Sequence, residues 1–200
     1  MTEPIPLLRV AGSHPEVGAQ IGLATADAVR RATAAPFDAE LVERYRAVTV
    51  EHVPWVVEEL DGAAGAAGVE PLAVFAASVE ELEGAPAPTG CTDLVAAGAV
   101  TADGHLLVGH NNDLAADDED DVVAIEWRVP GEPVVLTLGI GPWASVGWND
   151  AGLSVTGNEL TPGDERMGIP RLLQMRDVLT RRTLAEAVEA VLHPARASSY

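Results

Sequence analysis

Cys91 is the residue in this chain most suited to covalent chemistry, because it is the single cysteine and directly follows Gly90. Glycine tolerates a strained backbone and a close approach, so the thiol can attack the Gly90 carbonyl and cut the chain there. The cut would give Cys91 a free α-amino group, whose pKa of ~7.7–8.0 suits a base for its own thiol. The alternative interpretation is a small buried hydrophobic residue, the usual role of a lone cysteine.

A second polar motif, Gly109-His110-Asn111-Asn112-Asp113, lies in the strand predicted next along the chain. A Cys-Thr pair at a strand start, a hairpin and then Gly-His-Asn-x-Asp resembles the acyl-coenzyme A:6-aminopenicillanic acid acyltransferase family, which is peptidase family C45. These proteins are the acyltransferase branch of the N-terminal-nucleophile (Ntn) hydrolases and are similar to choloylglycine hydrolases. Residues 12–18 resemble the family's prosegment and residues 149–158 a part of its core, so the resemblance runs along the whole chain in order.

The resemblance implies a role for each matching residue. Gly90 and Cys91 would form the autocatalytic processing site, and Cys91 would then be the nucleophile. Asp113 matches an aspartate that holds the α-amino group or positions the cysteine, and His110 takes a position that is arginine in choloylglycine hydrolases. Asn158 matches an asparagine that can donate to the oxyanion, a contact whose removal costs ~10²–10³ in rate. The local alternatives are a turn cap for Asp113, a structural histidine for His110 and a turn residue for Asn158.

The resemblance also implies the fold and the activity. The expected fold is α+β, a four-layer αββα Ntn core over residues 91–200 preceded by a helical prosegment over residues 1–90, with the two processed chains remaining associated. The expected reaction is attack of Cys91 on an amide or thioester carbonyl through an acyl-enzyme, in an amidohydrolase or acyltransferase. A further catalytic asparagine and arginine would lie beyond Tyr200, so the sequence is expected to be a piece of a longer protein.

A different class of function stays open beside this one, a non-catalytic Ntn-like homologue or binding module in which Cys91 is structural. Thiol reactivity separates the two, because a catalytic cysteine is a partly exposed thiolate and a buried structural one is inert.

Composition narrows the partners and the chemistry. Thirty-one acidic residues against 12 basic ones give a net charge of −19, which argues against binding to nucleic acid or anionic lipid. The same charge disfavours an acyl-coenzyme A donor, so an N-acyl amide is the preferred substrate over acyl transfer from coenzyme A. The 12 basic residues are all arginine, which excludes lysine Schiff-base chemistry, and one cysteine excludes an intrachain disulfide or a cysteine-rich zinc site.

Several other functions lack their sequence signals. Apolar runs fall short of the ~18 residues that span a membrane, and no signal peptide opens the chain, so a cytoplasmic location is expected. No P-loop or Gly-x-Gly-x-x-Gly follows a strand, so we expect no nucleotide cofactor. The acidic residues 113–121 lack the glycine and glutamate positions of an EF-hand, and we expect no metal there.

The elements that must position these residues fall into two parts. Apolar spacings of three and four predict helices over residues 14–34, 39–50, from Pro54 to the glycine-rich residues 62–68, and 71–82. Residues 83–90 favour neither helix nor strand and are expected to be a linker. Beyond them, alternation and turn residues predict strands in hairpins over residues 92–100, 105–109, 122–129, 133–140, 144–148 and 153–156. Helices over 170–180 and 183–192 follow, the second beginning at a capping box of Thr183 and Glu186. About six strands would then lack a partner layer.

Overall fold

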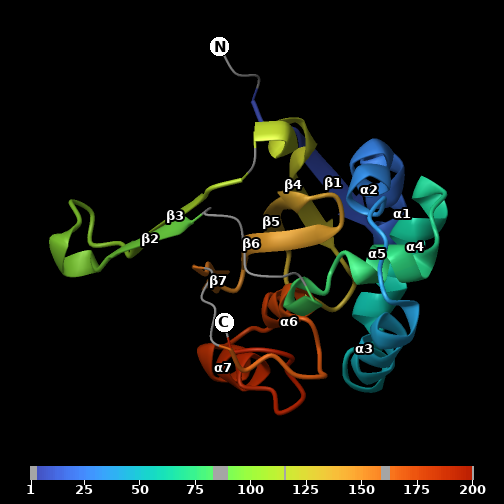
Figure 1. Ribbon diagram of the computed structural model, residues 1–200. Helices are drawn as coiled ribbons and strands as arrows, with labels where there is room; N and C mark the ends of the chain where they lie inside the picture. Colours follow the sequence, from blue (N-terminus) through green and yellow to red (C-terminus); the bar gives the residue numbers. More distant parts are fainter. Residues whose placement is uncertain (1–3, 83–89, 115, 159–162, 200) are drawn as a thin grey trace.

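The computed structural model describes residues 4–82, 90–114, 116–158 and 163–199 of the chain. The fold is α+β, as predicted: a five-stranded sheet, a separate two-stranded hairpin and two groups of helices (Figure 1). Most of the predicted linker, residues 83–89, lies outside the described residues. None of the helices in the described ranges is long and apolar enough to cross a membrane.

The N-terminal helices follow the predicted apolar spacing with two differences. The helix predicted over 14–34 is divided at Thr25, whose hydroxyl donates to the Ile21 carbonyl at 2.8 Å. The helix predicted over 71–82 ends early and is followed by a 3-10 turn. The helices are α1 (His14–Ala24), α2 (Ala26–Ala32), α3 (Ala39–His52), α4 (Pro54–Ala67), α5 (Pro71–Ala76) and the turn η1 (Glu80–Leu82).

Helix α4 runs through its glycines because helix α1 lies directly against it. A Cβ atom on Gly18 would lie 1.9 Å from the Glu59 carbonyl oxygen, and one on Gly22 would lie 2.1 Å from that of Ala63. Gly62 of α4 is also close to α1, since a Cβ atom built on it would lie 2.3 Å from the Pro15 carbonyl oxygen. Glycine at these positions permits contact between the two helix backbones. Helix α4 therefore continues through Gly62, although the low helix propensity of glycine suggested that it would end there.

The prediction of an entirely helical N-terminal part was wrong at one place, where residues 7–11 form a strand. Strand β1 (Leu7–Ala11) pairs in parallel with β4 (Val122–Arg128), with Leu7 opposite Ala124. The segment is short, and its partner lies far along the chain. The pairing of this strand therefore could not be predicted from local periodicity.

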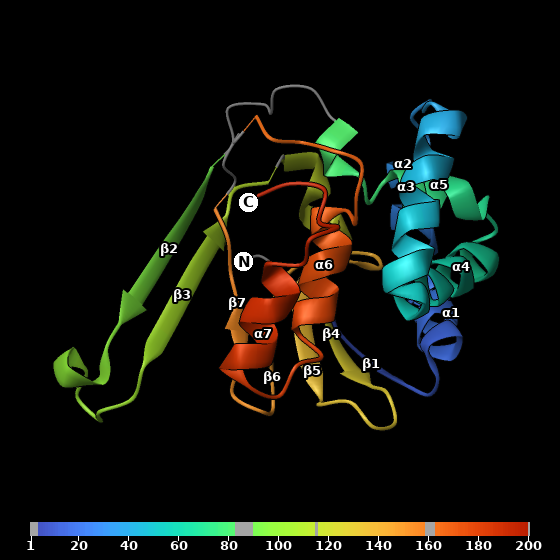
Figure 2. The ribbon, with the colours of Figure 1, turned by 90° about the horizontal axis from the view of Figure 1, so that it is seen from below.

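The remaining strands form the predicted antiparallel hairpins. Strands β5 (Val135–Ile140), β6 (Trp143–Asn149) and β7 (Ser154–Val155) complete a sheet in the order β1-β4-β5-β6-β7. Helices α6 (Arg171–Val178) and α7 (Leu184–Val191) close the chain, α7 beginning at the predicted capping box. Helix α1 packs on β1 and α6 on β6 (Figure 2). Side chains alternate along β4 between buried and half-buried, so one face of the sheet lies under helices.

The hairpin of β2 (Cys91–Ala96) and β3 (Leu107–Asn112) extends away from the rest of the fold (Figure 2). It was predicted over residues 92–100 and 105–109, and the observed strands lie slightly closer to the open end of the hairpin than the predicted ones. Many of its apolar side chains are exposed, among them Leu94 at 69% and Val95 at 62%. The open end, where Cys91 pairs with Asn112, is the part that meets the body of the protein.

A buried ionic cluster joins α6 to the N-terminal helices. Arg176 donates twice to Glu59 of α4, from Nη2 to Oε1 at 2.8 Å and from Nε to Oε2 at 3.2 Å, and these side chains are 4% and 5% exposed. His14 Nδ1 lies 2.8 Å from Glu59 Oε1, and its Nε2 lies 3.2 Å from Glu132 Oε1. The guanidinium also lies 4.5 Å from the ring centre of Trp127. The buried charges of Glu59 and Arg176 thus compensate each other.

Replacing Arg176 with methionine is expected to lower the free energy of unfolding by roughly 3–5 kcal/mol, because Glu59 stays buried without its guanidinium partner. The measurement is urea-induced unfolding followed by circular dichroism. Arg9→Met is the control, since Arg9 is 67% exposed and 3.7 Å from Glu126, and it should shift the midpoint little. Equal midpoints for the two variants would contradict a stabilising role for the cluster.

Candidate active site

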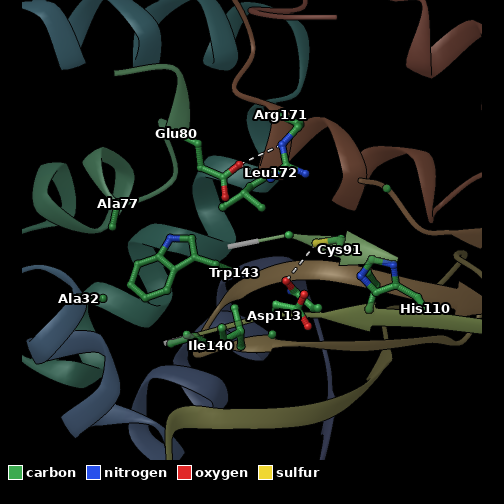
Figure 3. A pocket seen from close by; sticks show the side chains of 16 residues that line it. Ala32, Ala77, Glu80, Cys91, His110, Asp113, Ile140, Trp143, Arg171 and Leu172 are labelled. Carbon is green, nitrogen blue, oxygen red and sulfur yellow. Dashed lines mark hydrogen bonds and ion pairs between the residues drawn. The ribbon is translucent and has the colours of Figure 1, made fainter. Parts of the chain in front are cut away.

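Cys91 begins strand β2 at the edge of a cavity of about 300 Å³. The thiol is half-buried, and Sγ lies 3.4 Å from Asn112 Oδ1 on the paired strand, to which it donates. In Figure 3 Cys91 lies between His110 on one side and Trp143 on the other, with Leu172 above. The thiol can therefore meet a bound molecule.

The backbone before Cys91 is held by the end of strand β3. The Asp113 N–H donates to the Gly90 carbonyl oxygen at 3.1 Å. The Asp113 carboxylate lies along the same residue, since its Oδ2 is 3.8 Å from where a Cβ of Gly90 would be. A donor on this carbonyl stabilises negative charge on the oxygen when a nucleophile adds to the carbon. The Gly90–Cys91 bond thus has both a neighbouring thiol and a donor for its oxyanion.

His110 lies on the same face of the hairpin, fixed by a carboxylate that sequence reasoning did not select. Its Nδ1 lies 2.8 Å from Asp93 Oδ1, and the imidazole is 7% exposed. The hydrogen bond from His110, followed by one from Thr156, lowers the pKa of Asp93, so this carboxylate stays ionised and accepts a hydrogen bond from Nδ1–H. Nε2 is buried and has no hydrogen-bond partner within the described part of the chain. Both His110 and Cys91 line the cavity.

The rest of the cavity wall is mainly apolar and comes from the body of the protein. The Trp143 indole is held in place by hydrogen bonds from Nε1 to Ser78 Oγ at 3.0 Å and to the Val74 carbonyl at 3.3 Å. An ion pair between Arg171 and Glu80 adds a polar group (Figure 3). Further apolar lining comes from α2, the residue after α5, the residues after β3, and strands β5 and β6 with helix α6: Ala32, Ala77, Leu114, Ile140, Val146 and Leu172.

The structure brings four of the five predicted site residues to this cavity, namely Gly90, Cys91, His110 and Asp113. Asn158 is exposed and lines a neighbouring cavity of about 360 Å³. Two residues, Gly157 and Arg171, line both cavities.

Four residues of the site were missed. Asp93 and Asn112 could have been found from strand alternation, since they share a face with Cys91 and His110 once the hairpin register is known. Arg171 and Glu80 carry no local signal, because their meeting depends on how α6 packs beside η1.

The three tryptophans on the sheet strands β4 and β6 have different environments. Trp127 is buried and donates to Thr137 Oγ1 at 2.8 Å, Trp143 lines the cavity, and Trp148 is 53% exposed.

No group of three or more histidine, cysteine or acidic side chains is placed to hold a metal ion among the described residues. No protein-family model matches the chain, and the curated proteins contain no match to it either.

Proposed function

We propose that the chain belongs to a self-processing cysteine amidohydrolase or acyltransferase that resembles peptidase family C45. The observation that carries the proposal is the setting of the Gly90–Cys91 bond, which has a thiol beside an open cavity and a carbonyl that already accepts a hydrogen bond from Asp113. In the same proposal, strands β4 to β7 and helices α6 and α7 belong to a four-layer αββα core. The preceding prosegment is mainly helical and adds strand β1 to the sheet.

The proposed reaction has two stages. First, Cys91 Sγ attacks the Gly90 carbonyl carbon, the C–N bond breaks with proton transfer to the nitrogen, and water hydrolyses the resulting thioester. This frees the carboxylate of Gly90, the thiol and the α-amino group of Cys91. In the second stage, that amino group accepts the thiol proton as Sγ attacks a substrate amide. The amine leaves with a proton, and water or an acceptor amine takes the acyl group from sulfur.

The cavity fits an N-acyl amide with a compact apolar acyl group. Ile140, Trp143 and Leu172 supply apolar surface next to the thiol, and about 300 Å³ is at the small end of ligand sites. Acyl-coenzyme A, which carries several phosphates, is a less suitable donor for a chain of net charge −19. A reducing compartment such as the cytoplasm would keep the single thiol available.

The test is an intact-mass measurement, under denaturing conditions, of the protein purified from its complete reading frame, followed by alkylation of the folded protein. The expected result is two fragments that divide between Gly90 and Cys91, rapid alkylation of Cys91, and hydrolysis of some members of an N-acyl amide panel. A single uncut chain whose thiol resists alkylation in the folded protein would reject the proposal and favour the structural role of Cys91.

The two fragments are expected to remain together after the cut. Strand β1 precedes Gly90 and pairs with β4, which follows it, and the Glu59–Arg176 pair also joins the two sides. Size-exclusion chromatography of the cut protein should therefore give one peak that contains both masses. Elution of the fragments in separate peaks without denaturant would contradict this expectation.

A further inference from the structure

The first stage of the proposed reaction needs a different base from the second, in which the α-amino group of Cys91 takes the thiol proton. Before the cut, the nitrogen of Cys91 belongs to a peptide bond and has no basic lone pair, so the thiol cannot lose its proton to it. Asn112 Oδ1, which accepts from Sγ at 3.4 Å, is an amide oxygen and too weak a base to ionise a thiol. The uncut chain must therefore provide another acceptor near the thiol.

The hairpin register places His110 where such an acceptor is required. Cys91 pairs with Asn112 and Asp93 with His110, so all four side chains share one face of the hairpin. His110 is the diagonal neighbour of Cys91, a separation of ~7–8 Å between backbones that an imidazole ring can span. In Figure 3 the ring lies beside Cys91 on the cavity side of the strands.

The contact with Asp93 determines which nitrogen can act. An ionised carboxylate can only accept, so His110 Nδ1 carries the proton in the 2.8 Å contact with Asp93 Oδ1. The neutral imidazole then has its lone pair on Nε2, the atom that is buried and unpartnered among the described residues. An unpaired buried acceptor is costly in a folded protein, and its position at a cavity beside a thiol gives it a chemical use.

We propose that the Asp93–His110 pair drives the self-processing step, with His110 Nε2 as the base for Cys91 and Asp93 as the positioning residue that fixes the tautomer. The inference rests on the proposed function and adds to it a set of residues for the first stage. His110 Nε2 takes the thiol proton as the S–C bond forms, and the Gly90 oxyanion is held by the Asp113 N–H. The same proton passes to the Cys91 nitrogen as the C–N bond breaks, so His110 ends neutral.

The experiment follows cleavage of the full chain during cell-free synthesis, with intact mass as the readout. His110→Ala is expected to slow the cut by about 10²-fold or more, the range of a general base. Asp93→Asn should slow it as well, because the amide no longer fixes the Nδ1–H tautomer. Imidazole added to His110→Ala should restore part of the rate, which loss of a merely structural histidine would not permit. His110→Gln, closer in size, provides the same comparison if the alanine variant does not fold.

The same hairpin offers a matched control. His105 Nδ1 lies 3.0 Å from Asp103 Oδ2 near the exposed tip, where these side chains are 78% and 63% exposed and do not line the cavity. His105→Ala and Asp103→Asn should be cut at the wild-type rate.

The possible failures are distinguishable. Cleavage of folded His110→Ala and His110→Gln at the wild-type rate, or slow cleavage that imidazole leaves unchanged, would overturn this inference while the proposed function stands. An uncut wild-type chain would overturn the proposed function and this inference together.

Discussion

Replacement of Cys91 by alanine is expected to leave a single uncut chain and to reduce amide turnover by on the order of 10⁶-fold, the scale of losing a catalytic nucleophile. The effect follows from the half-buried thiol at the cavity, which is the attacking atom in both stages of the proposed reaction. Intact mass measures the cut, and release of free amine from the best amide substrate measures the turnover.

Two further variants separate loss of the nucleophile from loss of the fold. Cys91→Ser keeps a nucleophilic atom of nearly the same shape and should cut more slowly than the wild type, with an unchanged circular dichroism spectrum. Thr92→Ala alters the next residue, whose side chain is exposed on the opposite face of the strand, and should process normally. Complete processing of Cys91→Ala would remove the cysteine from the mechanism.

Gly18→Ala is expected to destabilise the protein by roughly 3 kcal/mol, at the upper end of what overpacking usually costs. The new methyl group would lie 1.9 Å from the Glu59 carbonyl oxygen, and a helix backbone cannot rotate aside as a side chain can. Helix α1 must then move away from α4, which also disturbs the Glu59 side chain that binds Arg176. Urea unfolding in the Cys91→Ala background, where each variant unfolds as one chain, gives the change in free energy.

Gly65 provides the matched control on helix α4. No atom lies within 4 Å of a Cβ atom built there, so Gly65→Ala should stabilise the helix by about 0.5–1 kcal/mol through its better helix propensity. The contrast in sign isolates the close approach of the helices from the general effect of adding a methyl group. A Gly18→Ala variant as stable as Gly65→Ala would show that α1 and α4 can separate without cost.

Local sequence signals predicted the parts of the fold that depend on local interactions. The turn residues 149–152 place β6 beside β7, and Thr183 with Glu186 begins α7, because the interacting atoms are a few residues apart. Strand β1 was missed because Leu7 finds its partner at Ala124, and α4 was expected to stop at its glycines because nothing nearby in sequence reveals the approach of α1.

The same distinction applies to the candidate site. Gly90 and Cys91 are adjacent, and the strand carrying His110 and Asp113 returns to them through a hairpin, so one predicted turn was enough to bring all four together. Trp143 and Arg171 arrive through the packing of the sheet and α6, which depends on the whole fold. Sequence spacing could not show that they share a cavity with the thiol.

The pairing of β1 with β4 has a kinetic consequence for the proposed maturation. The site at Gly90 takes shape only when segments from both ends of the chain have met, so folding must precede the cut. Once the cut is made, unfolding releases two separate polypeptide fragments. Their refolding then requires the fragments to associate, a bimolecular process whose rate rises with protein concentration. The uncut Cys91→Ala chain carries both partners of the parallel pair on one tether, and its refolding rate is independent of concentration. Maturation in this fold would thus convert a reversible folding unit into one that persists mainly because it unfolds slowly.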